Sequence, residues 1–182
     1  MDIRELKRFL VYYKSRFLYG CKGVKVGYRT YIGKRVKISR CSSIGKYGYI
    51  GENSTFHQKV QIGNFCLISD LVSIVGNDHC YEKVGSPIIF SGVPKPMTTI
   101  IGDDVWIGHM VSIKAGITIG EGSIIGSNSM VTHNIPPYEV WAGVPARKIK
   151  DRFSSKEDKK NHQSVLNEYN STGFIPKSDR EI

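Results

Sequence analysis

The 182-residue chain lacks the features that would direct it into or across a membrane. No uncharged apolar run approaches the roughly 20 residues that a membrane-spanning helix needs. Arg4, Glu5, Lys7 and Arg8 interrupt any apolar stretch near the N-terminus, so no secretory signal peptide is predicted. We therefore expect a cytoplasmic protein.

Cysteine is also scarce. The four cysteines, Cys21, Cys41, Cys66 and Cys80, show neither CxxC spacing nor a paired Cys/His ligand pattern. This arrangement predicts no disulfide framework and no structural zinc site, and we expect no metal requirement.

Acidic residues are nearly missing from one part of the chain. Residues 1–46 contain 13 Lys and Arg residues but only 2 acidic residues. Residues 47–182 contain 13 Lys and Arg residues and 14 acidic residues. Such a basic segment could face nucleic acid, anionic lipid or a phosphorylated substrate, or form a solvated surface. Because no nucleic-acid reading motif accompanies it, nucleic acid is not an expected partner. A weak peripheral membrane contact through this segment stays open.

The chain does contain a six-residue repeat. Every sixth residue is apolar in two runs, which are Val26, Ile32, Ile38, Ile44, Ile50, Phe56, Ile62, Ile68 and Ile74, and then Ile101, Ile107, Ile113, Ile119, Ile125 and Val131. Glycine often follows the apolar residue. A helix of 3.6 residues per turn cannot keep such positions on one face. A six-residue unit of one short strand and one turn can, and three units make one triangular coil. The repeat therefore predicts an all-β fold, a hexapeptide parallel β-helix of about five coils.

The two runs are out of phase, and this predicts an insertion. Ile74 and Ile101 are 27 residues apart, which is four hexads and three residues. The stretch of about 76–97 is rich in Pro and Gly and is expected to form an excursion loop. Residues 1–22 are predicted to form a basic amphipathic helix, residues 23–153 the β-helix, and residues 154–182 a polar tail with a short helix.

The helical segment at the N-terminus carries an apolar stripe. Its members are Ile3, Leu6, Leu10, Tyr13 and Phe17. We expect this stripe to cap the open first coil or to contact a neighbouring subunit. Residues 171–182 are expected to be frayed.

Three segments carry a resemblance to a known family. They are Gly76–His79, Ile101–Gly108, and Val131–Pro137 followed by Ala142–Lys148. Together they resemble the hexapeptide-repeat acyltransferases, in the branch of sugar O-acetyltransferases and xenobiotic acetyltransferases, over roughly residues 24–153. The resemblance implies a left-handed coil, a homotrimer with active sites between subunits, and acetyl-CoA as co-substrate. The chain departs from the family at His133, where lysine is usual.

His79 is the predicted catalytic residue. Transfer of an acetyl group from a thioester to a hydroxyl needs a base, and histidine can accept the proton and return it. The alternative for His79 is a turn histidine that makes a backbone hydrogen bond. Asp78 could orient the imidazole, and Cys80 could be a thiol nucleophile, but neighbours in an extended chain point to opposite sides.

The resemblance also implies binding residues. Those for acetyl-CoA are His109, Ser127, Thr132, His133, Arg147, Lys148 and Lys150. Cations suit the anionic end of the co-substrate because phosphates accept charge-assisted hydrogen bonds. His57, Asp78 and Trp106 are candidates for the acceptor pocket, with a solvent-exposed or packing role as the alternative.

The predicted function is transfer of an acetyl group from acetyl-CoA to a sugar hydroxyl, on a polysaccharide, its precursor or a nucleotide sugar. N-acetylation of an amino sugar and O-acetylation of a xenobiotic of the chloramphenicol or streptogramin type are close alternatives. A zinc carbonic anhydrase on the same coil would need paired histidines, which the sequence lacks. A non-catalytic β-helix scaffold is the remaining alternative.

Overall fold

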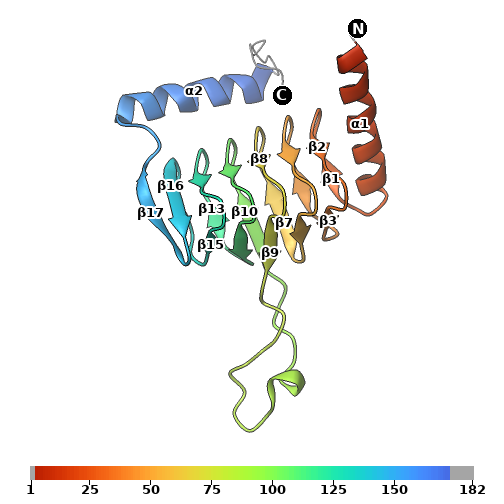
Figure 1. The fold of residues 1–182 in the computed structure, drawn as a ribbon, viewed down its shortest axis with the longest axis vertical. Helices are drawn as coiled ribbons and strands as arrows, with labels where there is room; N and C mark the ends of the chain where they lie inside the picture. The colour runs from red at the N-terminus through yellow and green to blue at the C-terminus, as the bar shows by residue number, and fades with distance from the viewer. Residues whose placement is uncertain (1–2, 173–182) are drawn as a thin grey trace. The chain divides into compact units, whose positions relative to one another are not determined.

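The chain winds into a coil of short parallel strands, as the six-residue repeat predicts (Figure 1). The computed structural model describes residues 3–172, with the side chains of residues 3–9 and 11 outside that description. Each hexad supplies one strand and one corner. Because three hexads complete a turn, residues 18 positions apart pair in parallel, as Lys25 does with Ser43.

Within the described range, successive strands are distributed over three sheets. The first contains β1 (Lys25–Val26), β4 (Ser43–Ile44), β7 (Lys59–Ile62), β10 (Thr98–Ile101) and β13 (Thr118–Ile119). The second contains β2 (Tyr31–Ile32), β5 (Tyr49–Ile50), β8 (Leu67–Ile68), β11 (Trp106–Ile107), β14 (Ile124–Ile125), β16 (Glu139–Gly143) and β17 (Ala146–Asp151). The third contains β3 (Lys37–Ile38), β6 (Thr55–Phe56), β9 (Ser73–Val75), β12 (Ser112–Lys114) and β15 (Met130–Val131). Only β17 runs antiparallel to its neighbour among these strands.

The apolar positions of the repeat line the inside of the coil. Thirteen of the fifteen are buried, and the other two, Val26 and Ile38, are partly buried in the first coil. Small residues at the corners are buried as well. The Ser42 hydroxyl accepts a 3.1 Å hydrogen bond from the backbone N–H of Val60, one coil further on. Each coil thus covers the apolar residues of its neighbours, which no single coil could do alone.

The glycines of the repeat allow successive coils to stack closely. A Cβ atom on Gly45 would lie 2.4 Å from the carbonyl group of Gly63, which is the equivalent residue one coil on. No side chain fits at that distance. The corners make a second demand, because residues such as Asn53 and Asn128 adopt positive φ angles of 58°. Asparagine tolerates this left-handed conformation better than most residues.

Residues 76–97 leave the coil between β9 and β10, where the phase break predicts an insertion. Lys59 pairs with Thr98, 39 residues later instead of 18, so the coil resumes in register after the loop. The excursion loop projects away from the sheets and contains a short 3₁₀ helix at Ile88–Phe90 (Figure 1).

Helix α1 (Ile3–Gly20) packs against the first coil through tyrosines. Tyr12, Ser15 and Tyr19 are buried, and the Tyr19 hydroxyl donates a 2.9 Å hydrogen bond to the carbonyl oxygen of Val36. A tyrosine can therefore fill the end of the coil with its ring and satisfy a backbone acceptor with its hydroxyl.

The prediction that the apolar stripe of α1 caps the first coil is wrong for Leu10, Tyr13 and Phe17, whereas its alternative, a contact with a neighbouring subunit, stays a prediction. Leu10, Tyr13 and Phe17 are exposed on the side opposite to the packed tyrosines. The side chains of Ile3 and Leu6 lie outside the described residues. Tyr12 and Tyr19 form the contact instead, and the Tyr19 hydroxyl adds a hydrogen bond to the coil.

The chain divides into two compact units, and the second begins at Phe153. It contains helix α2 (Lys156–Thr172), within the tail where a short helix is predicted. The Ser155 hydroxyl accepts a 3.0 Å hydrogen bond from the backbone N–H of Asp158 and so caps the helix start. Residues 173–182 lie outside the described range, and with them most of the segment expected to fray.

Among the described residues, neither helix has the length and apolar character that a membrane crossing requires.

Candidate active site

His79 lies at the root of the excursion loop, and hydrogen bonds hold that root in place. Gly76 turns the chain out of β9 with a φ of 91°. The Asn77 side-chain amide donates to the carbonyl oxygen of Lys95 at 2.9 Å, which joins the outgoing and returning limbs. The Gln58 side-chain amide donates to the Asn77 carbonyl oxygen at 3.4 Å and ties the root to the preceding coil.

The imidazole of His79 is accessible. Its side chain is 47% exposed, and its Nδ1 atom lies 3.6 Å from Oδ2 of Asp78. That separation exceeds a hydrogen bond, although the carboxylate lies closer than alternation along an extended chain predicts. The backbone N–H of Cys80 donates to the Gly92 carbonyl oxygen at 2.9 Å, a second link between the loop limbs. His79 therefore combines a fixed backbone with an imidazole that a substrate can reach.

Other candidates lie along the third sheet near this root. His57 directly follows β6, and Thr132 directly follows β15. By the register of the sheet, both are level with Val75 at the end of β9. His57 is exposed, and the Thr132 hydroxyl lies 2.9 Å from Nδ1 of His133. The β15 backbone is two strand spacings, or about 10 Å, from β9. Lys114 lies between them, directly paired with Val75, and sequence reasoning did not single it out.

Trp106 belongs to a different side of the molecule. It lies on β11 of the second sheet, is 48% exposed, and helps to line a surface hollow of about 210 Å³. The hollow is mainly apolar, and its other lining residues are Phe65, Leu67, Asp104, Val105, Ile124 and Arg152.

His109 and Ser127 lie at the corner between the second and third sheets. Both are exposed, and the Ser127 hydroxyl accepts a 3.1 Å hydrogen bond from the backbone N–H of His109. The two residues are 18 positions apart and so occupy equivalent places in successive coils. Ser127 therefore has a structural task at this corner, and the His109 ring lies on the surface beside it.

A β-bulge in the last hairpin determines which cations share a face. Val140 pairs with Lys150 and Trp141 with Lys148, so Ile149 is the extra residue of the bulge. Side chains normally alternate between faces along a strand, and one extra residue reverses the alternation beyond it. Arg147 and Lys150 therefore lie on the same face of β17.

Lys148 lies on the opposite face, where carboxylates surround it. Its Nζ atom is 2.8 Å from Oε1 of Glu139 and 2.8 Å from Oδ1 of Asp151. The hydrogen bonds that Lys148 donates to these two carboxylates raise its pKa, with Asp151 contributing most. The indole N–H of Trp141 donates to the other Glu139 oxygen at 2.7 Å. The charge of Lys148 is balanced within its own hairpin.

The cationic face of the hairpin continues the outer face that carries Trp106. Trp106 pairs with Ile124, Ile124 with Val140, and Val140 with Lys150. Directly paired residues project to the same side of a sheet. The row spans three strand spacings, or about 14 Å. An aromatic hollow and two exposed cations thus lie on one surface, which we call the β11–β17 face.

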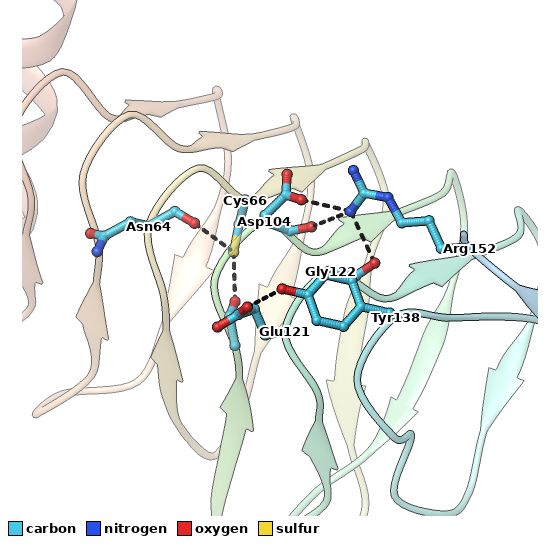
Figure 2. A network of polar contacts seen from close by, with 8 residues as sticks. Asn64, Cys66, Asp104, Glu121, Gly122, Tyr138 and Arg152 are labelled. Atoms are coloured by element: carbon cyan, nitrogen blue, oxygen red, sulfur yellow. Dashed lines mark hydrogen bonds and ion pairs between the residues drawn. The ribbon is translucent and has the colours of Figure 1, made fainter. Parts of the chain in front are cut away.

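Arg152 fixes the base of this hairpin to the coil, as Figure 2 shows. Its guanidinium donates to Oδ2 of Asp104 at 2.6 Å and to the Gly122 carbonyl oxygen at 3.0 Å. Close by, the buried Tyr138 hydroxyl donates a hydrogen bond to the Glu121 carboxylate. Burial is the main cause of the raised pKa of Tyr138, and the hydrogen bond to Glu121 is the second. Sequence reasoning missed this network because its partners are as many as 48 positions apart.

Cys66, drawn in the same view (Figure 2), is buried. Burial excludes its thiol as a nucleophile at neutral pH. Its thiol donates to the Gly102 carbonyl oxygen at 3.1 Å, and burial raises its pKa to about 12 (Figure 2). The thiol is therefore protonated at pH 7. Among the described residues, no group of three or more His, Cys, Asp or Glu side chains is arranged to hold a metal ion.

Comparison with known proteins places the chain in a family. Residues 98–133 match the family model "Bacterial transferase hexapeptide (six repeats)". A probable macrolide acetyltransferase of Lysinibacillus sphaericus is 38% identical over 61% of this chain and 67% of its own length. The galactoside O-acetyltransferase of Escherichia coli K12 is 41% identical over 59% of this chain and 53% of its own. The chain belongs to the hexapeptide-repeat acyltransferase family.

A solved structure supports the fold independently. The hexapeptide-repeat-containing acetyltransferase from Vibrio cholerae O1 biovar eltor, complexed with acetyl coenzyme A, superposes with a TM-score of 0.65. It is 22% identical, and the match covers 81% of this chain and 84% of that one. The chain spans about half the length of the first curated chloramphenicol acetyltransferases that it matches.

Proposed function

We propose that the protein is an acetyl-CoA-dependent O-acetyltransferase that acts on a sugar hydroxyl. The observation that carries the proposal is the accessible imidazole of His79 on a hydrogen-bonded loop root. The similarity to a galactoside O-acetyltransferase supports a sugar acceptor, whereas the similarity to a macrolide acetyltransferase keeps xenobiotics in the test. Acetyl-CoA is the substrate that supplies the thioester.

His79 acts as the general base. Its neutral imidazole accepts the proton of the acceptor hydroxyl while the hydroxyl oxygen forms a bond to the acetyl carbon. The carbon–sulfur bond of the thioester then breaks, and the imidazolium returns the proton to the departing sulfur. Oδ2 of Asp78 lies 3.6 Å from Nδ1 of His79, and His57 lies one coil below on the acceptor side.

The β11–β17 face binds the co-substrate. Arg147 and Lys150 are exposed and project to the same side, where phosphate oxygens can accept charge-assisted hydrogen bonds. Trp106 offers an aromatic surface along the same row. The binding surface extends toward the third sheet through four further residues, His109, Ser127, Thr132 and His133. Lys148 does not bind the co-substrate in this proposal, because Glu139 and Asp151 already bind its ammonium group.

The active site lies between subunits. His79 leaves the third sheet, whereas Trp106 and Lys150 project from the second, so one chain does not bring them into a single cleft. A neighbouring copy can place its His79 against the β11–β17 face. This arrangement agrees with the homotrimer and the left-handed coil that the family resemblance implies, and we include both in the proposal.

Release of free thiol from acetyl-CoA tests the proposal. Purified protein is offered galactosides, other hexoses, amino sugars, nucleotide sugars and chloramphenicol. We expect acceptor-dependent release that falls about 100- to 10,000-fold in the His79→Ala variant. His162→Ala in the second unit is the matched control and should retain activity. The dissociation constant for CoA should stay within about twofold, since the imidazole contributes to the transition state more than to ground-state binding.

Three outcomes would contradict the proposal. Turnover of the His79→Ala variant at the wild-type rate would remove His79 from the chemistry. Absence of both thiol release and CoA binding would instead favour the scaffold function. Release with chloramphenicol alone would assign the protein to xenobiotic acetylation.

A further inference from the structure

The outward side of α1 presents apolar side chains that the coil does not cover. Leu10, Tyr13 and Phe17 are 58%, 47% and 72% exposed, whereas Tyr12 and Tyr19 on the other side are buried. Spacings of three and four residues place the first three together on the helix surface. We call Leu10, Tyr13 and Phe17 the α1 outer face.

This face is hollowed as well as apolar. Tyr13 and Phe17 line a shallow hollow of about 370 Å³ together with Arg16, Gly20 and Cys21. Contiguous apolar surface of this kind on a helix marks a place where something docks.

The N-terminal segment that contains this face carries charge of one sign. Between residues 10 and 46 the chain has ten Lys and Arg residues and no Asp or Glu. All ten side chains are exposed: Lys14, Arg16, Lys22, Lys25, Arg29, Lys34, Arg35, Lys37, Arg40 and Lys46. Within the described part of the chain, an ion pair is formed by one of them, Arg35, at 3.8 Å from Glu52.

We propose that the α1 outer face and these cations dock the protein onto an anionic membrane surface. Apolar side chains of a surface helix enter the boundary between headgroups and acyl chains, and flanking cations meet anionic headgroups. A symmetric contact with a second copy would bring two strongly basic segments together. Nucleic acid would match the charge but leave the apolar residues exposed. The bilayer surface is the occupant that uses both features.

Docking of this kind would position the enzyme rather than change its chemistry. It goes beyond the proposed acetyl transfer and does not depend on it. An acceptor sugar carried on a lipid would then be presented at the surface where the enzyme is held.

Vesicle cosedimentation of the full chain tests the proposal. We expect binding to phosphatidylcholine vesicles that contain phosphatidylglycerol and little binding to phosphatidylcholine alone. Phe17→Ser should weaken partitioning about tenfold through lost apolar burial. The triple variant K14Q/R16Q/K22Q, on and directly after α1, should weaken it about 100-fold, because each cation near an anionic surface contributes about fivefold. Val165→Ser removes an exposed apolar residue of α2 and should bind as the wild type does.

The proposal would be overturned if the protein bound neither type of vesicle, or if it bound both types equally. A change of oligomeric mass on Phe17→Ser without vesicle binding would assign the face to a second copy. Salt-sensitive binding to a nucleic-acid duplex without vesicle binding would assign the cations to that partner. Circular dichroism melting checks that each variant is folded, and acetyl transfer is measured separately because vesicle binding does not require it.

Discussion

Replacing Arg147 and Lys150 with glutamine should weaken CoA binding strongly, whereas the same change at Lys148 should not. Arg147 and Lys150 are exposed on the β11–β17 face. Lys148 is held by Glu139 and Asp151 on the opposite side of the hairpin. The three cations lie within four residues of sequence, so the comparison isolates the effect of the bulge.

The magnitude follows from exposure. A hydrogen bond to a charged group contributes about 1.5–3 kcal/mol when it is shielded from water. Both side chains are exposed, so solvent screening lowers the contribution to about 1 kcal/mol each. Loss of both corresponds to about 2 kcal/mol, or about a 30-fold rise in the dissociation constant.

Isothermal titration calorimetry with CoA at low and high salt measures this change. The double variant R147Q/K150Q should bind more weakly and should also lose most of its salt dependence, because screening acts on charge pairs. K148Q should stay within about twofold of the wild type. Equal weakening by K148Q and by the double variant would refute the argument from the bulge.

Three further predictions concern the scaffold. Gly45→Ala should lower the free energy of unfolding by about 2 kcal/mol or more, because its Cβ would meet backbone at 2.4 Å, whereas Gly20→Ala, with open space around it, should be neutral or stabilising in urea unfolding. The pKa of Cys66 is raised from about 9 to about 12, so between these values the folded thiol stays protonated while the thiol of the unfolded chain ionises. The stability that Cys66 contributes should therefore be complete below about pH 9 and decline as pH rises toward 12. Alkaline denaturation followed by fluorescence would show this decline. Arg152→Met should remove the 2.6 Å ion pair with the Asp104 carboxylate and lower the unfolding free energy by about 2 kcal/mol, whereas Arg29→Asn at an exposed corner should change it little.

The repeat made most of the fold predictable. Six-residue spacing identifies the inward positions because a strand and a corner together take six residues, and the phase break before Ile101 locates the excursion loop. The packing side of α1 was not predictable in this way. Its exposed stripe is more apolar than the side that packs, and the contact depends on the hydroxyl of Tyr19 reaching the carbonyl oxygen of Val36.

The sequence nominates the candidate site residues one by one, but not their arrangement. His79 stands out because it lies at the start of the loop. The division between Lys148 and Lys150 depends on a bulge at Ile149, which no residue spacing in the hairpin reveals. The Arg152–Asp104 pair joins positions 48 residues apart across the inserted loop. Such contacts follow from the register of the coil and not from any local pattern.

Complementation between inactive subunits tests the central claim that His79 of one copy acts at the β11–β17 face of another. His79→Ala protein and the triple variant W106A/R147E/K150E are each measured alone, then unfolded together, refolded as a mixture and assayed for thiol release. In a random mixture of trimers, about one quarter of the interfaces would pair an intact His79 with an intact face. We expect the mixture to recover about that share of wild-type activity. No recovery from subunits that do assemble together would show that each site is built within a single chain.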